Sequence, residues 1–326
     1  KKKKKTNPDV KGAAKRIAML CLAVLLAASF LTSCRSSGVK VKTDDKGFYD
    51  YNGYIIKSEY PMDEQSLDKA GEKLRKIYEL YLKDQDVKTY FAIVPDKNAW
   101  AFEAEGQNVI DYSELYARMQ ADTEDFASYI ELDDLLDMES YYKTDAHWRQ
   151  EKIYPVAQRI AEAMGCELTA EYGKAVANES FIGAYGRQSD LAMEPEELIY
   201  LTNEALAGCI VTDYASEDER YVTTGVYTIA SAASEDGEGY DMFLDGAKSL
   251  LTIENPASTT DKELIIFRDS FGSSIAPFFT ECYRKVTLVD TRYLPSERVG
   301  KFVEFDRQDI LFLYSVPVLN NSVMLK

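Results

Sequence analysis

Four short apolar runs constrain the fold of this chain more than any other feature. They lie at residues 89–95, 263–267, 285–289 and 310–314. Strands that read as unbroken apolar runs are buried on both faces, as in a parallel sheet covered by helices. Residues 66–82, which precede the first run, carry apolar side chains at helical spacing and have a possible cap at Ser66. The pattern predicts an α/β fold with a doubly wound, mostly parallel sheet flanked by helices.

Further helices and a hairpin are expected in the domain, which we place over residues 48–326. Asn52–Gly53 separates two strand-like segments and predicts a hairpin at 48–56. Helical patterns follow at 151–164 and 270–283. The first of these helices must begin near Glu151, because proline is tolerated only in a first turn and Pro155 follows closely.

The stretch from 170 to 260 has a different pattern. It lacks long helical periods and contains the strand-like segments 221–224 and 225–229 between glycine, serine and acidic clusters. We therefore expect a β-rich insertion or subdomain there.

The first 34 residues indicate export. Five lysines open the chain, and an apolar stretch follows from residue 17 to residue 31. About fifteen apolar residues are too few to span a bilayer comfortably and are typical of a signal peptide. The stretch ends in Leu31-Thr32-Ser33-Cys34, which resembles the bacterial lipobox. We expect Cys34 to be lipidated, residues 35–47 to form a polar tether, and the domain to lie outside the cytoplasmic membrane, anchored by lipid. An N-terminal anchor that is not cleaved would leave the domain in the same compartment.

Charge and cysteine content narrow the classes of partner. The formal net charge is −17, and basic side chains are concentrated before residue 17. This balance argues against nucleic acid and anionic lipid surfaces as partners. Beyond the export signal the cysteines are Cys166, Cys209 and Cys282. Their odd number and the lack of Cys-x-x-Cys spacing indicate no disulfide framework.

His147 is the only histidine in the chain. Proton transfer near neutral pH falls to this imidazole, because no other side chain has an unperturbed pKa in that range. Asp145 precedes it by two positions and Trp148 follows it directly. Zinc sites built from several histidines are excluded, and we expect no metal or cofactor. Taken alone, His147 also fits a structural role, and Asp145 also fits a helix cap.

Ser270 follows the apolar run at 263–267 by three positions. A serine in the turn from a buried strand into a helix has its hydroxyl at the sheet edge, near backbone amides that can stabilise an oxyanion. The alternative is that Ser270 only caps its helix. With Asp145 and His147 it completes a Ser-His-Asp set, in loops that an α/β sheet would bring to one edge.

These motifs resemble the DHHW protein family of bacterial envelope lipoproteins, and the layout is similar to the SGNH-like domain of alginate O-acetyltransferases. The resemblance covers roughly residues 48–326 and rests on Asp145-x-His147-Trp148, Asp269-Ser270-Phe271 and Phe181-Ile182-Gly183-Ala184-Tyr185-Gly186-Arg187, with weaker similarities at 94–97 and 290–293. It implies an SGNH-like fold in a circularly permuted order, because the Asp-His pair precedes the serine. Ala146 stands where the family name has a second histidine, and Arg268 replaces the glycine of the usual Gly-Asp-Ser block.

The resemblance implies a chemical role for each residue of the site. Ser270 would be the nucleophile, His147 its general base, and Asp145 the carboxylate that orients the imidazole. Asp269 is a rival for the last role, but its side chain should point away from that of Ser270 in an extended segment. Oxyanion donors would be the backbone N–H of Ser270 and that of Gly183, whose missing Cβ permits close approach to a substrate carbonyl.

Four more side chains are candidates for contacts with the substrate. Trp148 and Tyr185 could line a sugar or acyl site, although Trp148 serves equally well to bury its loop. Arg187 belongs to the same segment as Tyr185. Arg268, beside the nucleophile, would either clash with an acyl substrate or stabilise an oxyanion or an acidic sugar. Cys282 is a poorer nucleophile candidate, because it lies twelve positions after Ser270 in the helical pattern.

The motifs and the export signal together lead to one hypothesis of function. The chain would transfer acyl groups at a carbohydrate hydroxyl through an acyl-serine intermediate. With water as acceptor it would be an O-acetyl esterase, and with an envelope polysaccharide it would be an O-acyltransferase served by a membrane-bound acyl-donor partner. The alternative is a non-catalytic, lipid-anchored glycan-binding or scaffold protein with the same fold. The two hypotheses differ in whether the Ser270 hydroxyl lies within hydrogen-bond reach of the His147 ring.

Overall fold

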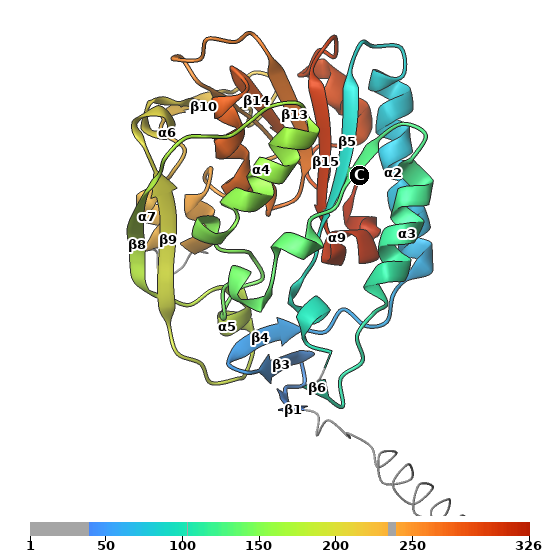
Figure 1. Ribbon diagram of the computed structural model, residues 1–326, viewed down its shortest axis with the longest axis vertical. Helices are drawn as coiled ribbons and strands as arrows, with labels where there is room; N and C mark the ends of the chain where they lie inside the picture. The colour runs from blue at the N-terminus through green and yellow to red at the C-terminus, as the bar shows by residue number, and fades with distance from the viewer. Residues whose placement is uncertain (1–38, 103, 234–238) are drawn as a thin grey trace, which may run out of the picture. The chain divides into compact units, whose positions relative to one another are not determined.

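An eight-stranded sheet forms the centre of the computed structural model, which describes residues 39–102, 104–233 and 239–326 (Figure 1). Five neighbouring strands are parallel, and three antiparallel strands extend the sheet on one side. Across the sheet the order is β11 (Tyr221–Thr224), β10 (Ile210–Asp213), β12 (Leu250–Glu254), β14 (Lys285–Val289), β13 (Glu263–Arg268), β15 (Asp309–Ser315), β5 (Lys88–Val94) and β7 (Ser128–Ile130).

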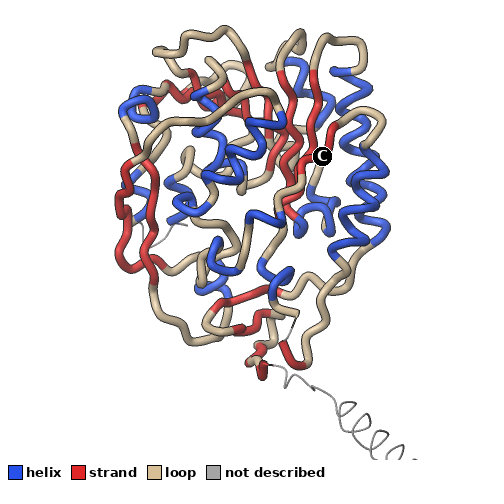
Figure 2. The backbone as a smooth tube through the Cα atoms, viewed as in Figure 1, coloured by secondary structure: helices blue, strands red, loops and turns tan. Residues whose placement is uncertain are grey.

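Helices cover both faces of this sheet (Figure 2). Ile266 and Leu311 share one hydrophobic core with residues of α4 (Tyr154–Ala163). The neighbouring residues Ile265 and Phe312 share a second core with residues of α2 (Glu64–Ile77) and α3 (Tyr112–Thr123). Successive side chains of a strand point to opposite faces, so one apolar run contributes to both cores. The predicted α/β fold, with its mostly parallel sheet between helices, is confirmed.

Of the predicted helices, α2 begins earlier than the sequence suggested and α4 begins later. Helix α2 is capped by Asp63, whose carboxylate accepts the N–H of Ser66 at 3.0 Å, so Ser66 is not the cap. Helix α4 begins at Tyr154, after the 3-10 turn η5 (Gln150–Lys152), and Pro155 therefore lies in its first turn.

The helix predicted at 270–283 is divided. It consists of α8 (Gly272–Ile275) followed by the 3-10 helix η7 (Ala276–Glu281). Pro277 supplies no N–H to the hydrogen-bond ladder and disfavours a continuous α-helix there. Short segments complete the described chain: the π-helix η1 (Tyr78–Leu82), η2 (Lys97–Trp100), η3 (Asp133–Leu135), η4 (Met138–Ser140), α5 (Ala184–Gln188), α6 (Glu204–Gly208), α7 (Ile229–Ala232), η6 (Gly239–Met242), η8 (Ser296–Lys301), α9 (Val316–Asn320) and η9 (Ser322–Met324).

Residues 170–260 are divided between two sheets. β8 (Gly173–Phe181) and β9 (Glu196–Thr202) form a separate antiparallel pair, whereas β10, β11 and β12 extend the main sheet. β12 was not predicted, and the strand expected at 225–229 is absent: Tyr227 forms an isolated bridge and Ile229 begins α7. The later part of this stretch therefore belongs to the main sheet and not to a separate subdomain.

The predicted hairpin at 48–56 is present. β3 (Phe48–Tyr51) and β4 (Tyr54–Lys57) pair across Asn52 and Gly53, which both have positive φ. Part of the segment expected as a tether, β2 (Lys42–Thr43), pairs with β3, so the ordered structure begins before residue 48. The short strands β1 (Val39–Lys40) and β6 (Ala104–Glu105) complete the strands of the described ranges. The expected signal peptide, with Cys34, lies outside the described residues. No helix within those residues is long and apolar enough to cross a membrane.

A disulfide joins Cys166, shortly after α4, to Cys282, directly after η7. The expectation that the chain has no disulfide is therefore wrong. The two cysteines are 116 positions apart, and only the fold brings their Cα atoms to 6.2 Å. The bond also removes Cys282 as an alternative nucleophile.

Candidate active site

A cavity of about 430 Å³ lies where the parallel strands end. Asp96 follows β5, Ser270 follows β13, Arg292 follows β14, and Ser315 ends β15. In open α/β sheets, ligands bind outside these carboxyl ends. Helix α9 begins at this end of the sheet, and the β3–β4 hairpin and α5 lie beyond it (Figure 1). The cavity is lined by Lys57, Ser58, Glu59, Asp96, Ala146, His147, Tyr185, Ser270, Phe271, Arg292, Ser315, Pro317, Val318, Asn321 and Met324.

Ser270, His147 and Asp145 form a continuous hydrogen-bonded chain. Ser270 Oγ lies 2.7 Å from His147 Nε2. His147 Nδ1 lies 2.5 Å from Asp145 Oδ1. With the ring proton on Nδ1, the imidazole donates to the carboxylate and accepts from the serine hydroxyl. This tautomer is the one that a general base requires.

The turn that holds Ser270 is fixed by Asp269. The carboxylate of Asp269 is fully buried and accepts the N–H of Phe271 at 3.0 Å and the N–H of Ser315 at 2.7 Å. The second bond ties the end of β13 to the end of β15. Asp269 therefore shapes the turn, and Asp145 is the residue that contacts the imidazole.

Asp145 is held as a carboxylate although it is buried. Burial by itself raises the pKa of this carboxyl. The electrostatic attraction and hydrogen bond of His147, and the N–H groups of Ala184 and His147, outweigh this effect and lower the pKa well below its usual range. The Ala184 N–H donates to Asp145 Oδ2 at 2.6 Å. The negative charge is thus available to stabilise an imidazolium.

Gly183 has a different function from the one the sequence suggested. Its N–H donates to Thr144 Oγ1 at 2.9 Å, so it already has a partner. A Cβ at this position would lie 2.3 Å from the Cβ of Asp145. The missing side chain makes room for Asp145, and not for a substrate carbonyl.

Lys97 fixes the loop that carries Asp145. Its Nζ is buried and donates to the carbonyl oxygens of Asp145 at 2.8 Å, Tyr142 at 3.0 Å, Lys143 at 3.4 Å and Ile55 at 2.5 Å. Burial lowers the pKa of Lys97 to about 7, while the negative charge of Asp145 acts in the opposite direction. The side chain connects β4 to the loop that holds Asp145.

Two aromatic rings, those of Tyr240 and Phe271, contact the imidazole. The ring of Tyr240 stacks on His147 with centroids 3.9 Å apart and an interplanar angle of 6°. Tyr240 and Trp148 both donate to Ser274 Oγ, at 2.7 and 2.8 Å. Trp148 is fully buried, so it belongs to the core and not to the substrate site.

Of the other residues that were predicted to contact the substrate, one lines the cavity and two lie elsewhere. Tyr185 lies in the cavity wall. Arg268 is fully buried next to Asp290 and does not line the cavity, so it neither obstructs an acyl group nor reaches an oxyanion there. Arg187 is exposed and lines a different depression, together with Asn178 and Phe181.

Several residues in and around the cavity were not predicted from the sequence. Asp96 and Arg292 lie within the weakly similar segments 94–97 and 290–293, but no local signal distinguished them. Glu59 and Tyr240 belong to segments without a motif, and only the fold brings them to the site.

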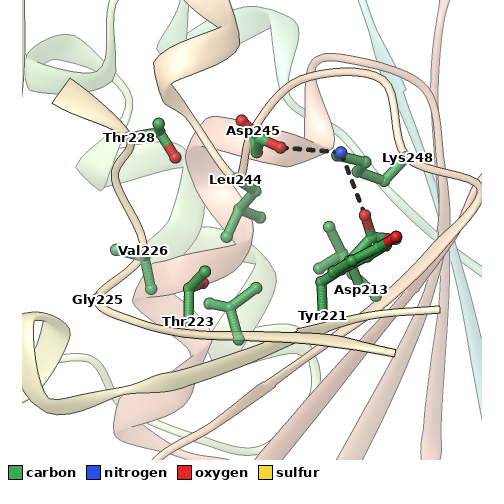
Figure 3. A pocket seen from close by; sticks show the side chains of 11 residues that line it. Asp213, Tyr221, Thr223, Gly225, Val226, Thr228, Leu244, Asp245 and Lys248 are labelled. Atoms are coloured by element: carbon green, nitrogen blue, oxygen red, sulfur yellow. Dashed lines mark ion pairs between the residues drawn. The ribbon is translucent and has the colours of Figure 1, made fainter. Parts of the chain in front are cut away.

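A second pocket of about 220 Å³ lies beside the antiparallel end of the sheet (Figure 3). Lys248 bridges Asp213 at 3.1 Å and Asp245 at 2.8 Å within it. None of the predicted site residues lines this pocket. Across the described ranges, no group of three or more His, Cys, Asp or Glu side chains could hold a metal ion.

The fold is similar to that of several solved structures. A DHHW family protein from Eubacterium siraeum matches with a TM-score of 0.64 and 17% identity, over 86% of this chain and 94% of that chain. Bacillus cereus PatB1 with a sulfonyl adduct matches with a TM-score of 0.65 and 19% identity, over 86% of this chain and 95% of that chain. The O-acetyltransferase domain of Pseudomonas putida AlgJ matches with a TM-score of 0.50 and 12% identity, over 86% of this chain and 92% of that chain. The fold therefore resembles that of a DHHW family protein and that of an O-acetyltransferase domain, as the sequence motifs predicted. No family model and no curated protein matches the sequence.

Proposed function

We propose that this chain is an extracytoplasmic serine-dependent acyltransferase or esterase that acts on an envelope carbohydrate. The observation that carries the proposal is the hydrogen-bonded chain from Ser270 Oγ through the His147 ring to Asp145, at 2.7 and 2.5 Å. It lies at the wall of a cavity large enough for a sugar unit. The similarity in fold to a domain described as an O-acetyltransferase domain supports the acyl-transfer class.

The first half-reaction acylates Ser270. Its Oγ attacks the carbonyl carbon of the donor while His147 Nε2 removes the hydroxyl proton. The tetrahedral intermediate then releases the donor alcohol, which takes the proton back from Nε2. Asp145 remains a carboxylate and stabilises the imidazolium between these two transfers.

The second half-reaction transfers the acyl group to water or to a sugar hydroxyl. His147 Nε2 takes the proton of the acceptor, whose oxygen attacks the acyl-serine carbonyl, and returns that proton to Ser270 Oγ as the ester bond breaks. The backbone N–H of Ser270 is the candidate oxyanion donor of the turn. The next three amides, of Phe271, Gly272 and Ser273, all donate within the turn.

The proposed compartment and partners follow from the sequence. A lipid on Cys34 would anchor the domain to a membrane outside the cytoplasm, close to envelope polysaccharide. A membrane-bound partner would then supply the acyl group if the acceptor is a sugar and not water.

Covalent labelling of the serine tests the catalytic proposal. We expect a fluorophosphonate to form one adduct, at Ser270, and 4-nitrophenyl acetate to be hydrolysed. Ser270→Ala abolishes both, whereas Ser128→Ala, at an exposed position on β7, changes neither. A chain that shows neither adduct nor hydrolysis is instead a glycan-binding or scaffold protein. In that case Ser270→Ala leaves its affinity for glycans intact.

A further inference from the structure

The turn after β13 offers few backbone donors to an oxyanion at Ser270. The N–H groups of Phe271, Gly272 and Ser273 donate within the turn, at 3.0, 3.1 and 3.1 Å. The N–H of Gly183 donates to a side chain of the neighbouring loop. The N–H of Ser270 is thus the backbone candidate. A carbonyl oxygen has two lone pairs, so the oxyanion can accept a second hydrogen bond from a side chain in the cavity wall.

Arg292 leaves the sheet beside Ser270. The strands β13 and β14 are parallel neighbours, and Phe267 pairs with Val289. Ser270 and Arg292 each lie three positions beyond that pair. Neighbouring strands are about 4.8 Å apart. Both residues line the cavity, so the nucleophile and a guanidinium group share one wall of it.

Asp290 fixes the orientation of this guanidinium group. Its buried carboxylate accepts hydrogen bonds from Arg292 Nε at 2.9 Å and from Arg292 Nη2 at 2.7 Å. The Arg292 side chain is 12% exposed. Its Nη1 donates to none of the residues that the structure describes. One edge of the group is therefore held by Asp290, while Nη1 keeps its N–H bonds for a ligand.

Three other side-chain donors of the cavity wall, those of Lys57, Asn321 and Ser315, suit an oxyanion less well. Lys57 is exposed, with Nζ 5.7 Å from the centre of the Phe48 ring, and Asn321 is exposed too. Both would lose side-chain freedom on binding a substrate. Ser315, at the end of β15, carries a neutral hydroxyl, and a charged donor forms the stronger hydrogen bond.

We propose that Arg292 is a catalytic residue, which donates a hydrogen bond from Nη1 to the oxyanion formed when Ser270 attacks an acyl carbonyl. This inference rests on the proposed acyl transfer at Ser270. As the bond from Oγ to the carbonyl carbon forms, the proton passes to His147 Nε2 and the π-electron pair moves onto the carbonyl oxygen. That pair reforms the carbonyl when the bond to the donor alcohol breaks. The charge is absent from the bound ester, so the contact with Arg292 lowers the barrier more than it aids binding.

Two substrates that differ in one atom test the proposal on the full chain. They are 4-nitrophenyl acetate and its thionoester, in which sulfur replaces the carbonyl oxygen and accepts hydrogen bonds weakly. Arg292→Ala should lower kcat for the oxygen ester by about 10²-fold or more, the effect of losing one oxyanion donor. The thionoester should lose much less, so the ratio of the two kcat values falls. Added guanidinium should restore part of the rate on the oxygen ester.

Two further variants separate this role from a structural one. Arg292→Lys keeps a positive charge near Asp290 but loses the fork, and it should show the same fall in the ratio. It supplies the measurement if Arg292→Ala does not fold. Arg307→Ala, at a side chain that is 73% exposed, should change neither rate.

Each contrary outcome overturns the role of Arg292. Equal losses on both substrates would show that Arg292 only supports the fold, and unchanged rates would show that the oxyanion does not contact it. A fall in the ratio in Ser315→Ala but not in the Arg292 variants would assign the donor to Ser315. Failure of the proposed function looks different, because the wild type would then hydrolyse neither substrate and form no adduct at Ser270.

Discussion

The candidate site depends on one imidazole. His147 is the only histidine of the chain, and its two ring nitrogens bridge Ser270 and Asp145. Tyr240 stacks on its face and keeps the ring in the plane that this bridge requires. A substitution at this position leaves no second imidazole to take over the proton transfer.

His147→Ala should therefore lose acylation and regain part of it from added imidazole. General-base catalysis contributes about 10²–10⁴-fold, so we expect a loss of that size in the rate of 4-nitrophenol release. Free imidazole can occupy the space that the side chain leaves next to Ser270 and accept its proton. Ser270→Ala is the control, because imidazole cannot replace a nucleophile. A His147→Ala protein of full activity would exclude His147 as the base.

The residues of the triad were predictable, but most of their supports were not. Asp145, His147 and Ser270 lie in two short motifs, so local sequence suffices to find them. Gly183 and Arg268 were expected to contribute to the site, but the roles expected for them were wrong. The direction in which a side chain points depends on tertiary packing. Nothing local could show that Gly183 approaches Asp145, or that Asp290 retains Arg268 in the interior.

At the scale of elements, Lys97 joins the β3–β4 hairpin to the loop that holds Asp145. It extends from η2, directly after β5, to the Ile55 carbonyl of β4 and to carbonyls between Tyr142 and Asp145. Lysine is rarely buried unless it is paired. Here the pairing is with main-chain oxygen atoms, so the side chain serves as a connector.

Lys97→Met should weaken both the fold and the catalysis. Each buried carbonyl that loses its donor costs about 1–3 kcal/mol, so we expect the free energy of unfolding to fall by about 2 kcal/mol or more. The kcat for aryl acetate should fall as well, because Asp145 loses its support, while KM changes less. Denaturant unfolding and steady-state kinetics measure the two effects. Lys83→Met, at an exposed ion pair with Glu79, is the matched control and should change neither. An unaltered kcat would show that Lys97 does not position Asp145.

The disulfide links two elements on one face of the sheet, the end of α4 and the end of η7. Closing a loop of this length restricts the unfolded chain, and such bonds contribute typically 2–4 kcal/mol. Cys166→Ser with Cys282→Ser should lower the free energy of unfolding by about that amount, with Ser270 labelling retained at low temperature. A reducing agent should lower the midpoint of the wild type and leave that of the double variant unchanged. Equal midpoints for reduced and oxidised wild type would contradict this.

The prediction from sequence was most accurate where one strand contributes to two cores. The runs at 263–267, 285–289 and 310–314 correspond to β13, β14 and β15 almost residue for residue. It was least accurate for β12 and the 225–229 segment, whose state depends on pairing with residues far along the chain.

At the scale of the whole molecule, the order of the motifs is unimportant because the sheet gathers them. β5, β13, β14 and β15 are parallel and end at one edge, so residues separated by more than a hundred positions meet in one cavity. The chain as a whole also produces an electrostatic field, because its formal net charge is −17. That field acts on a ligand before it reaches the cavity.

Varying the salt concentration separates the effect of the long-range field from the effect of contacts inside the cavity. An anionic ester such as 4-acetoxybenzoate should show a kcat/KM that rises severalfold from about 10 mM to about 300 mM salt, because the Debye length shrinks from about 30 Å to below 10 Å. The neutral 4-nitrophenyl acetate should change little over the same range. A difference between the two esters that survives at high salt is then due to contacts inside the cavity. Identical salt dependence for the two esters would show that the net charge does not influence the approach of substrates.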